Sequence, residues 1–538
     1  MLCTGERRFV PLGIGAFFFS IYLLTAGGHY GGDGFWNYLT AESIVLDGDL
    51  IIGDRPFLIE EMYNQYTHDQ GGGVIAGSGR SYSKYGLGQA LVEVPFYAVG
   101  HMIARLVPGV PRDYVTMFTT SITNVVVCAF WCIVFFKLAR QLSFGRHTLI
   151  WITGVFGVGS VVFPYAGYGF SEPLIGLTLL GTVTALHQYR QSGARSCLAW
   201  SGALLGLSAA TKLYIVIVLP CLAVYLWSCT KSLTRSRQLR AWAALLVPLI
   251  LFGLLIAWHN WVRYGSILKT GYHLDDVASE FWTGAEGGYF SFSPFNIVIA
   301  VYGLLFSAGR GLLLFLPAAF FVPIAILRFG KAHREEAMLF TALIAVHLIF
   351  FACFRAWHGG SWGPRYLMPI LPFLVLPLGG LIENGGAREA VIKTLAVIGG
   401  LIQLPATLMN VHFFTRFVIE NRIGHFTYDP RHFTDLVFSP GLSPIAGTFY
   451  QLISAVSRLT RGYSLNYPVP SSGSEGVLVS LSSYDLIDVW WVNALRTGFL
   501  GNLATVVVYT VVAALFLGSV LTARALIKWS RSSNPAEG

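Results

Sequence analysis

The sequence has little charge for its length. Only 12% of its 538 residues are Asp, Glu, Lys or Arg, whereas a soluble protein carries about 25%. Apolar residues make up 54% of the chain, and this composition excludes both a soluble multidomain protein and an intrinsically disordered chain. Apolar runs long enough to cross a bilayer recur along the chain. We therefore expect an all-α polytopic membrane protein.

Cysteine is also scarce, with seven residues in the chain. This scarcity argues against a disulfide-rich secreted scaffold. Cys128 and Cys132 have the spacing of one helical face, but no Cys or His pair accompanies them at the spacing of a zinc site. We interpret both as small core residues. No metal-binding motif and no long internal repeat stand out elsewhere in the sequence.

The net charge of +9 is distributed in short basic runs between apolar segments. Such runs encode membrane orientation, because Lys and Arg are retained on the cytoplasmic side. A nucleic-acid partner would require the basic residues to gather on one folded surface, and they do not. The charge distribution is best satisfied by about twelve crossings with both chain ends in the cytoplasm.

The first apolar run, Phe9–Ala26, is longer than the core of a signal peptide and is expected to be retained as a helix. The segment Cys197–Cys229 is long for one span and short for two, so we predict two short helices that meet at Lys212. The other predicted crossings are Tyr114–Phe136, Thr148–Pro164, Pro173–His187, Ala241–Val262, Leu312–Leu327, Ala337–Phe354, Tyr366–Ile382, Val391–His412 and Phe499–Ile527.

Two further apolar segments are not expected to cross the membrane. Phe295–Ser307 is too short. Gly86–Val107 has a single polar stripe and an apolar opposite face, which is typical of an interfacial helix lying on the membrane. The stripe consists of Gln89, Glu93, Tyr97, His101 and Arg105.

The predicted topology divides the chain into three parts. Residues 1–412 form a transmembrane module whose first outer loop, residues 27–112, contains the interfacial helix. Residues 413–498 form an extracytoplasmic segment, and residues 499–538 form the last crossing and a cytoplasmic tail. Most acidic residues lie in the outer segments. Because carboxylates bind divalent cations, a divalent cation remains one alternative for a cofactor.

Two charged residues in the first outer loop are candidates for chemistry. Asp33 follows the first helix closely and is flanked by glycine, so it is either a general base at the membrane surface or the N-cap of the next helix. Lys84 opens the interfacial helix. It either binds a lipid phosphate at headgroup depth or snorkels toward water.

Two more candidates lie within apolar surroundings. Glu172 stands in an outer turn before Pro173, where it is a functional ionisable group, the start of a helix, or both. Lys212 lies in the middle of an apolar segment, and a buried lysine must find a partner or lose its charge. We predict that Lys212 lines an internal cavity.

The densest group of candidates is residues 355–366, which contain two arginines, one histidine and two tryptophans between apolar segments. Arginine binds phosphate with two parallel donors, and tryptophan stacks on sugars. An aromatic belt with snorkelling arginines is the alternative. That alternative accounts for the tryptophans, but it accounts less well for Gly359, Gly360 and Gly363.

Together these features resemble the GT-C superfamily of polyprenyl-phosphate-sugar-dependent glycosyltransferases. The resemblance is nearest to the bacterial branch of protein mannosyltransferases and the lipid A aminoarabinose transferase, and it covers the chain up to about residue 410. Five features carry it: the acid after the first helix, the Lys84-Tyr-Gly sequence, Gly206-Leu-Ser-Ala-Ala-Thr-Lys212, Asn260–Tyr272, and Trp357–Tyr366.

The resemblance implies a reaction. Asp33 would take the proton of an acceptor hydroxyl, with inversion at the sugar carbon. The leaving lipid phosphate would be held by Lys84 and Arg365, with His358 or Lys212 beside them. The substrate would be oriented by Glu172, Trp357 and Tyr38. Family members that use monophosphate donors generally do without a metal.

The expected partners are a polyprenyl-phosphate-linked sugar donor, a lipid, glycan or protein acceptor, and membrane lipids. The expected location is the bacterial inner membrane, with the active site facing the periplasm. A lipid-linked-substrate transporter or flippase, and a non-catalytic protein of envelope assembly, remain alternatives. A cavity that joins Asp33 to a lipid-facing groove would argue against the non-catalytic alternative.

Overall fold

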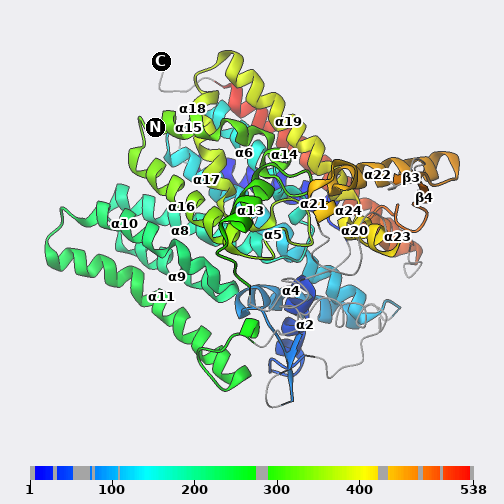
Figure 1. The fold of residues 1–538 in the computed structure, drawn as a ribbon, viewed down its shortest axis with the longest axis horizontal. Coiled ribbons are helices and arrows are strands. Elements are labelled where there is room, and N and C mark those ends of the chain that lie inside the picture. The colour runs from blue at the N-terminus through cyan, green and yellow to red at the C-terminus, as the bar shows by residue number, and fades with distance from the viewer. Residues whose placement is uncertain are drawn as a thin grey trace.

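The computed structural model describes residues 6–27, 33–52, 73–75, 79–106, 109–273, 289–421, 434–469, 477–496 and 501–532. Helices make up most of this part of the chain (Figure 1), which confirms the expected all-α class. Two small antiparallel sheets accompany them. Strand β1 (Gly73–Ile75) pairs with β2 (Ser81–Ser83), and β3 (Asn466–Val469) pairs with β4 (Val477–Ser480).

The helices of the membrane module are α1 (Glu6–Thr25), α2 (Asp33–Leu46), α4 (Leu87–Leu106), α5 (Arg112–Gln141), α6 (Arg146–Gly157), α7 (Val162–Tyr165), α8 (Glu172–Ser192), α9 (Arg195–Thr211), η1 (Leu213–Val218), α10 (Leu219–Thr230), α11 (Arg235–Tyr264), η2 (Gly271–His273), α13 (Pro294–Phe306), α14 (Leu312–Phe315), η3 (Pro317–Phe321), α15 (Val322–Phe329), α16 (Arg334–Cys353), η4 (Arg365–Ile370), α17 (Leu371–Val375), η5 (Leu376–Leu378), α18 (Gly379–Ile382) and α19 (Gly386–Leu408). The C-terminal part adds α20 (Val411–Glu420), α21 (Thr434–Phe438), η7 (Pro440–Leu442), α22 (Pro444–Arg461), α23 (Trp490–Arg496) and α24 (Asn502–Arg531).

Seven helices in the described ranges are long and apolar enough to cross a membrane, and three shorter apolar helices accompany them. The total of twelve crossings therefore stays a prediction. Several predicted crossings are broken in the structure. The segment Tyr366–Ile382, for example, is divided among η4, α17, η5 and α18, because its prolines lack the N–H groups that a continuous helix requires.

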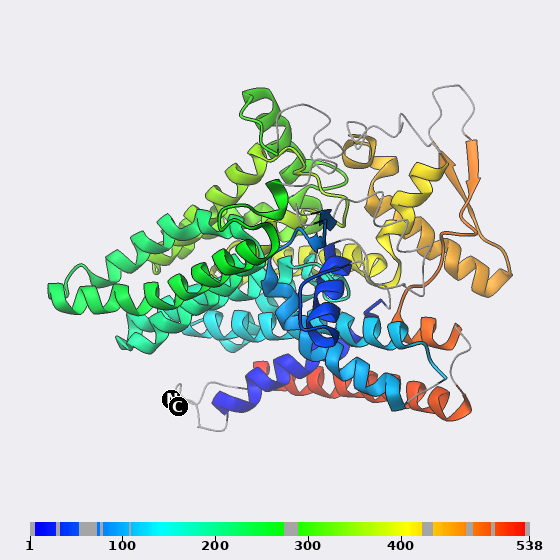
Figure 2. The same cartoon turned by 90° about the horizontal axis from the view of Figure 1, so that it is seen from below.

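The bundle packs helices that are far apart in sequence. Figure 2 shows α1 and α24 side by side, and both contact the rest of the bundle. The main core lies among α5, α6 and α8, where the rings of Phe135 and Phe156 stack with centroids 4.4 Å apart. Cys128 and Cys132 are fully buried in this core and unbonded to other cysteines, which confirms their interpretation as core residues.

The predicted break at Lys212 is confirmed. Helix α9 ends at Thr211, Lys212 has an extended backbone with φ −144° and ψ 119°, and η1 begins at Leu213. Helices α9 and α11 run side by side (Figure 1). The outward face of α11 is apolar and exposed, as expected of a surface in contact with lipid; it includes Leu246, Val247, Ile250, Leu251 and Leu254.

Helix α4 matches the predicted interfacial segment within one residue at each end. The first part of its polar stripe faces the protein, whereas Arg105 at its end is exposed. Gln89 and Glu93 are buried and hydrogen-bonded to each other at 2.9 Å, and the Tyr97 hydroxyl donates to Glu42 at 2.8 Å. The exposed side is apolar and includes Leu91, Val99, Met102 and Leu106. A helix with this orientation suits an environment of lipid outside and protein inside.

Candidate active site

Two carboxylates and two cations from four separate elements meet at one point, which we call the charged cluster. The Lys212 ammonium lies 2.8 Å from Glu172 Oε1 and 3.2 Å from Asp33 Oδ2. The Arg365 guanidinium lies 3.4 Å from Asp33 Oδ2 and 3.6 Å from Glu172 Oε1. Four of the residues singled out in the sequence are therefore direct neighbours.

Each member of the charged cluster stands at the end of a helix. Asp33 and Glu172 are the first residues of α2 and α8, where free backbone N–H groups and the helix dipole favour a carboxylate. Lys212 caps the C-terminus of α9, and Arg365 begins η4. For Asp33 and Glu172, the helix-start and functional interpretations are therefore compatible, because one position serves both.

The charged cluster is buried to different depths. The exposed fractions of the side chains are 1% for Glu172, 8% for Lys212, 10% for Arg365 and 16% for Asp33. An unpaired charge at such depth would be costly, and the pairing offsets that cost. Asp33 is the most accessible of the four.

The surroundings of Asp33 hold it in the ionised form. Burial alone would raise the pKa of Asp33, but Arg365, Lys212 and Lys84 outweigh burial and hold this pKa well below its usual range. The Tyr85 hydroxyl adds to the effect by donating a hydrogen bond to Asp33 Oδ1 at 2.8 Å. The basicity of Asp33 therefore depends on how strongly these cations interact with its carboxylate.

Aromatic rings lie beside two cations of the site, Arg365 and Lys84. The Arg365 guanidinium lies 4.6 Å from the Phe170 ring centroid. The Lys84 ammonium lies 5.5 Å from the Tyr85 ring and 5.9 Å from the Tyr272 ring. Cation–π contacts hold a positive charge in place. Among the described residues, the charged cluster and Lys84 together comprise three cations and two carboxylates.

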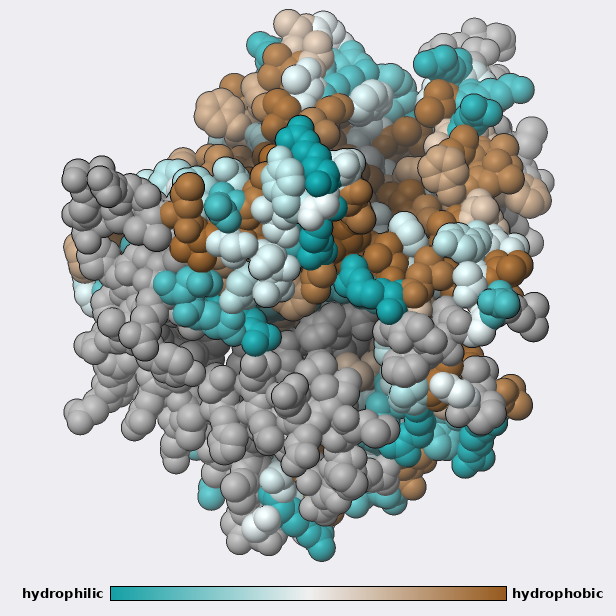
Figure 3. Space-filling model, turned by 90° about the vertical axis from the view of Figure 1, so that its right-hand side faces the viewer, coloured by the Kyte–Doolittle hydropathy of each residue, from teal (hydrophilic) through white to brown (hydrophobic). Residues whose placement is uncertain are grey.

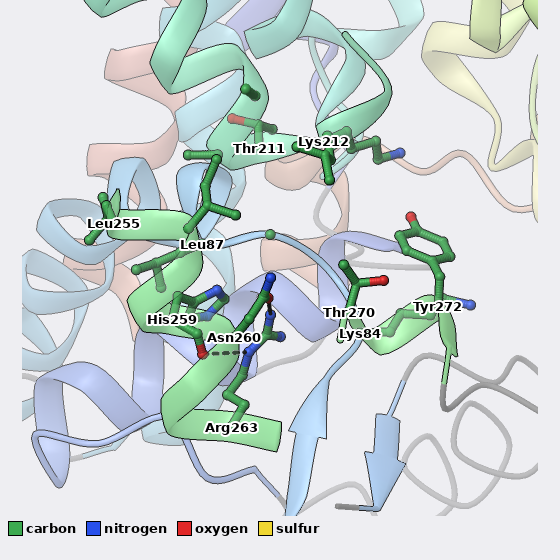
Figure 4. A pocket seen from close by; sticks show the side chains of 15 residues that line it. Lys84, Leu87, Thr211, Lys212, Leu255, His259, Asn260, Arg263, Thr270 and Tyr272 are labelled. Atoms are coloured by element: carbon green, nitrogen blue, oxygen red, sulfur yellow. Dashed lines mark hydrogen bonds between the residues drawn. The ribbon is translucent and has the colours of Figure 1, made fainter. Parts of the chain in front are cut away.

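A cavity of about 510 Å³, its open mouth included, adjoins the charged cluster (Figure 4). Lys84, Lys212 and Tyr272 lie on one side of it in Figure 4. Leu255 and Ile256 of α11 contribute an apolar wall. Leu213 also lines the cavity and is 48% exposed. The lining of the cavity therefore combines two lysines with apolar side chains, one of which is exposed at the surface.

Arg263 of α11 fixes the backbone that carries Lys84. Its Nη1 donates to the carbonyl oxygens of Ser83 at 2.6 Å and Tyr85 at 3.1 Å, and its Nη2 donates to Asn260 Oδ1 at 3.2 Å. Gly271 lies against this turn so closely that a Cβ atom would come within 2.3 Å of the Lys84 Cα. The Asn260–Tyr272 stretch therefore clamps the Lys84 turn, a role that sequence reasoning missed.

Arg310 fixes the backbone of the loop of residues 355–366, as Arg263 fixes that of the Lys84 turn. It is 2% exposed and donates to the carbonyl oxygens of His358 and Gly359. Sequence reasoning missed Arg310 as well, although its position between Gly309 and Gly311 marks a close approach of backbone. Burial, and after it the charge of Arg310, lowers the pKa of His358 to about 3. This low pKa favours the neutral imidazole. A phosphate-binding role for His358 stays a prediction, since a neutral imidazole still carries one N–H donor.

Tyr38 and Trp357, the two aromatic candidates, have other neighbours. The Tyr38 hydroxyl lies 2.8 Å from Thr116 Oγ1, in a core cluster that includes Phe35 and Tyr97. Trp357 packs against α13 at Gly303, where a Cβ atom would come within 2.0 Å of the indole. A substrate-orienting role for these two residues stays a prediction.

No group of three His, Cys, Asp or Glu side chains within the described ranges is placed to hold a metal ion. The charged cluster has only two carboxylates, and both are engaged by cations.

No protein-family model matches this chain, and no curated protein matches it in sequence. Five chains of solved structures are similar to it, among them the following two. One is ArnT from Cupriavidus metallidurans bound to undecaprenyl phosphate, with a TM-score of 0.48 and 13% identity over 97% of this chain and 77% of that chain. The other is the same protein in the apo state, with a TM-score of 0.46 and 13% identity over 93% of this chain and 74% of that chain.

Replacing Lys212 by Met should destabilise the protein strongly, because Glu172 would lose its closest cation while still buried. Breaking a buried ion pair from one side costs about 3–5 kcal/mol. The Lys212→Met/Glu172→Gln double variant should recover much of this loss. Thermal unfolding of the detergent-purified proteins measures both effects. The control is Lys231→Met at an exposed position, and a melting temperature for Lys212→Met equal to that of the control would contradict the buried pair.

Proposed function

We propose that this protein is an integral-membrane inverting glycosyltransferase, which moves a sugar from a polyprenyl-phosphate-linked donor to an acceptor hydroxyl on the extracytoplasmic side. One observation carries the proposal. A single cavity presents Lys84 and Lys212 together with an apolar wall, and Lys212 directly contacts the ionised Asp33. A lipid phosphate needs the lysines and the apolar wall, and a transfer reaction needs the carboxylate.

In this proposal the donor would lie in the cavity in one direction. Its phosphate would lie at Lys84 and Lys212, the two ammonium groups that line the cavity. Its prenyl chain would follow Leu255 and Ile256 toward the exposed face of α11. The lipid could then enter sideways from the membrane, while the sugar stays next to Asp33. Arg263 supports this arrangement by holding the backbone of the Lys84 turn.

In the proposed reaction, Asp33 accepts the proton of the acceptor hydroxyl while that oxygen attacks the anomeric carbon from the face opposite the phosphate. The bond between this carbon and the phosphate oxygen breaks, and its electron pair leaves on the polyprenyl phosphate. Lys84, Lys212 and Arg365 face the charge that develops there, which is where fixed cations lower the barrier most.

The same cations act on both the base, Asp33, and the leaving phosphate. In the free site they hold the pKa of Asp33 low and leave it a weak base. As negative charge builds on the leaving phosphate, they share their charge with it, and the basicity of Asp33 rises as the proton arrives. Glu172 is too buried to meet a sugar directly, so within this proposal it acts by positioning Lys212 and Arg365.

Asp33→Asn should lower sugar transfer by at least about 100-fold, the usual contribution of a general base. The assay uses a set of undecaprenyl-phosphate sugars with membranes that contain the protein. Protein level and membrane insertion should stay normal. Asp49→Asn is the matched control, since Asp49 is an exposed carboxylate just after the same helix. Full activity of the Asp33→Asn variant would refute the general-base role, and a transporter would then be the better interpretation.

The pH profile of the reaction should report on the same residue. Because the pKa of Asp33 lies below the usual value of about 4, Asp33 stays ionised at pH 4 and below it, and kcat/KM should show no acid limb at or above that pH. Lys212→Gln removes one of the cations that depress this pKa, so the acid limb should move to higher pH. An acid limb unchanged by Lys212→Gln would show that Lys212 does not control the base.

Lys84→Ala should weaken donor binding more than folding. Undecaprenyl phosphate should raise the melting temperature of the unsubstituted protein, and this increase should shrink in Lys84→Ala and largely return in Lys84→Arg. Arg80→Ala removes an exposed cation close to the same turn and should leave the increase unchanged. An equal increase in Lys84→Ala and in the unsubstituted protein would place the phosphate elsewhere.

A further inference from the structure

Helix α22 of the C-terminal part has its polar and apolar faces reversed with respect to a soluble helix. Its outward side chains are apolar, with exposed fractions of 37% for Phe449, 55% for Ile453, 50% for Val456 and 72% for Leu459. Its buried face is small and polar and includes Thr448, Gln451, Ser454 and Ser457. A row of large exposed apolar residues on a helix that hides its polar side marks a surface for an apolar environment.

Hydrogen bonds fix which face of α22 points inward. Gln451 Nε2 donates to the Tyr484 carbonyl oxygen at 2.8 Å, and Ser454 Oγ donates to Asp485 Oδ2 at 2.6 Å. Arg458 Nη1 lies 2.8 Å from Asp485 Oδ1, and the Asp485 side chain is fully buried. Rolling the helix would break this network and leave Asp485 buried without its cation. The apolar face is therefore held outward.

The chain that binds α22 is attached to the ends of two apolar helices. The backbone N–H of Asp488 donates to the Leu408 carbonyl oxygen at the end of α19, and that of Trp490 donates to the Ala26 carbonyl oxygen just after α1, both at 2.8 Å. The indole of Trp491 donates to the Leu24 carbonyl oxygen at 3.0 Å. Tryptophans that bind helix ends are typical of the membrane–water interface.

These attachments set the level of α22 along the membrane normal. Helix α19 is a candidate span, and α1 is one of the shorter apolar helices. Helix α2, which begins at Asp33, closely follows α1 in the chain. The ends of α1 and α19, and with them α22, therefore lie on the side of the membrane that carries the charged cluster.

The apolar face of α22 adjoins the exposed apolar surface of α19, which is a candidate span. Helix α22 packs against α19, whose exposed residues are also apolar and include Val397, Leu401 and Leu404. Ile445, near the start of α22, packs into the main core of the bundle. Figure 3 looks onto the right-hand side of Figure 1, where α22 lies, and hydrophobic residues gather over much of its upper half with hydrophilic ones among them.

We propose that α22 is an interfacial membrane helix, whose face of Phe449, Ile453, Val456 and Leu459 enters the phospholipid leaflet on the side of the charged cluster. Arg461, exposed at the end of the helix, then lies at the depth of the lipid phosphates. The helix anchors the C-terminal part of the chain to the membrane at a point apart from the crossing of α24. Helix α4 has the same reversed pattern, and the environment of both helices is lipid.

The test uses the full-length protein in nanodiscs of phosphatidylcholine and phosphatidylglycerol. A nitroxide label is attached to Ile453→Cys, and its relaxation by oxygen, which concentrates in lipid, is compared with relaxation by a water-soluble nickel chelate. Ser483→Cys is the control, because Ser483 is exposed on the segment to which α22 is hydrogen-bonded. The unsubstituted protein, labelled in the same way, gives the background of the native cysteines.

The ratio of oxygen to nickel relaxation should be several-fold higher at position 453 than at position 483. A second label at Val456→Cys should give the same result, since it lies one turn further along the same face. A label at 453 as accessible to nickel as the label at 483 would place α22 in water and overturn the proposal. A label shielded from both reagents would show that protein covers this face, which would overturn it as well.

Discussion

The ion pair between Lys212 and Glu172 is the constraint on which the site depends. A lysine in the middle of an apolar segment cannot stay charged without a carboxylate, and the 2.8 Å contact supplies one. The pair joins the end of α9 to the start of α8, and Asp33 at 3.2 Å adds the start of α2. The ends of three helices therefore meet where the buried Lys212 pairs with two carboxylates. The break in the helix at Lys212 allows its side chain to reach both of them.

Two buried arginines hold the loops around this centre. Arg263 binds the carbonyl oxygens of the Lys84 turn, and Arg310 binds those of the loop that leads to Arg365. A guanidinium has several donors in a rigid plane, so one side chain fixes two or three backbone groups at once. The protein itself therefore fixes the Lys84 turn and the loop before Arg365, and the proposed reaction would need cations that are preorganised in this way.

Helices α4 and α22 turn polar residues inward and apolar residues outward at the surface of the protein. In both α4 and α22, polar residues such as Gln89 and Ser454 have partners inside the protein, whereas large apolar residues are exposed. In water this exposure of apolar side chains would be unfavourable. Contact with lipid, as proposed for α22, would make it favourable.

The sequence by itself determined the class of the protein, the break at Lys212, the bounds of α4 and the short length of α13, because these depend on local hydropathy and on single charges within apolar runs. It also singled out Asp33, Glu172, Lys212 and Arg365, whose charges need an explanation wherever they lie. Only the tertiary structure decided that these four meet, that Tyr85 donates to Asp33, and that Tyr38 contacts Thr116 and Trp357 contacts Gly303. Arg263 and Arg310 escaped prediction because they bind backbone carbonyls, which every residue carries and no sequence pattern marks. The periodicity of α4 and α22 shows two faces, but which face turns inward depends on partners that fold in from distant parts of the chain.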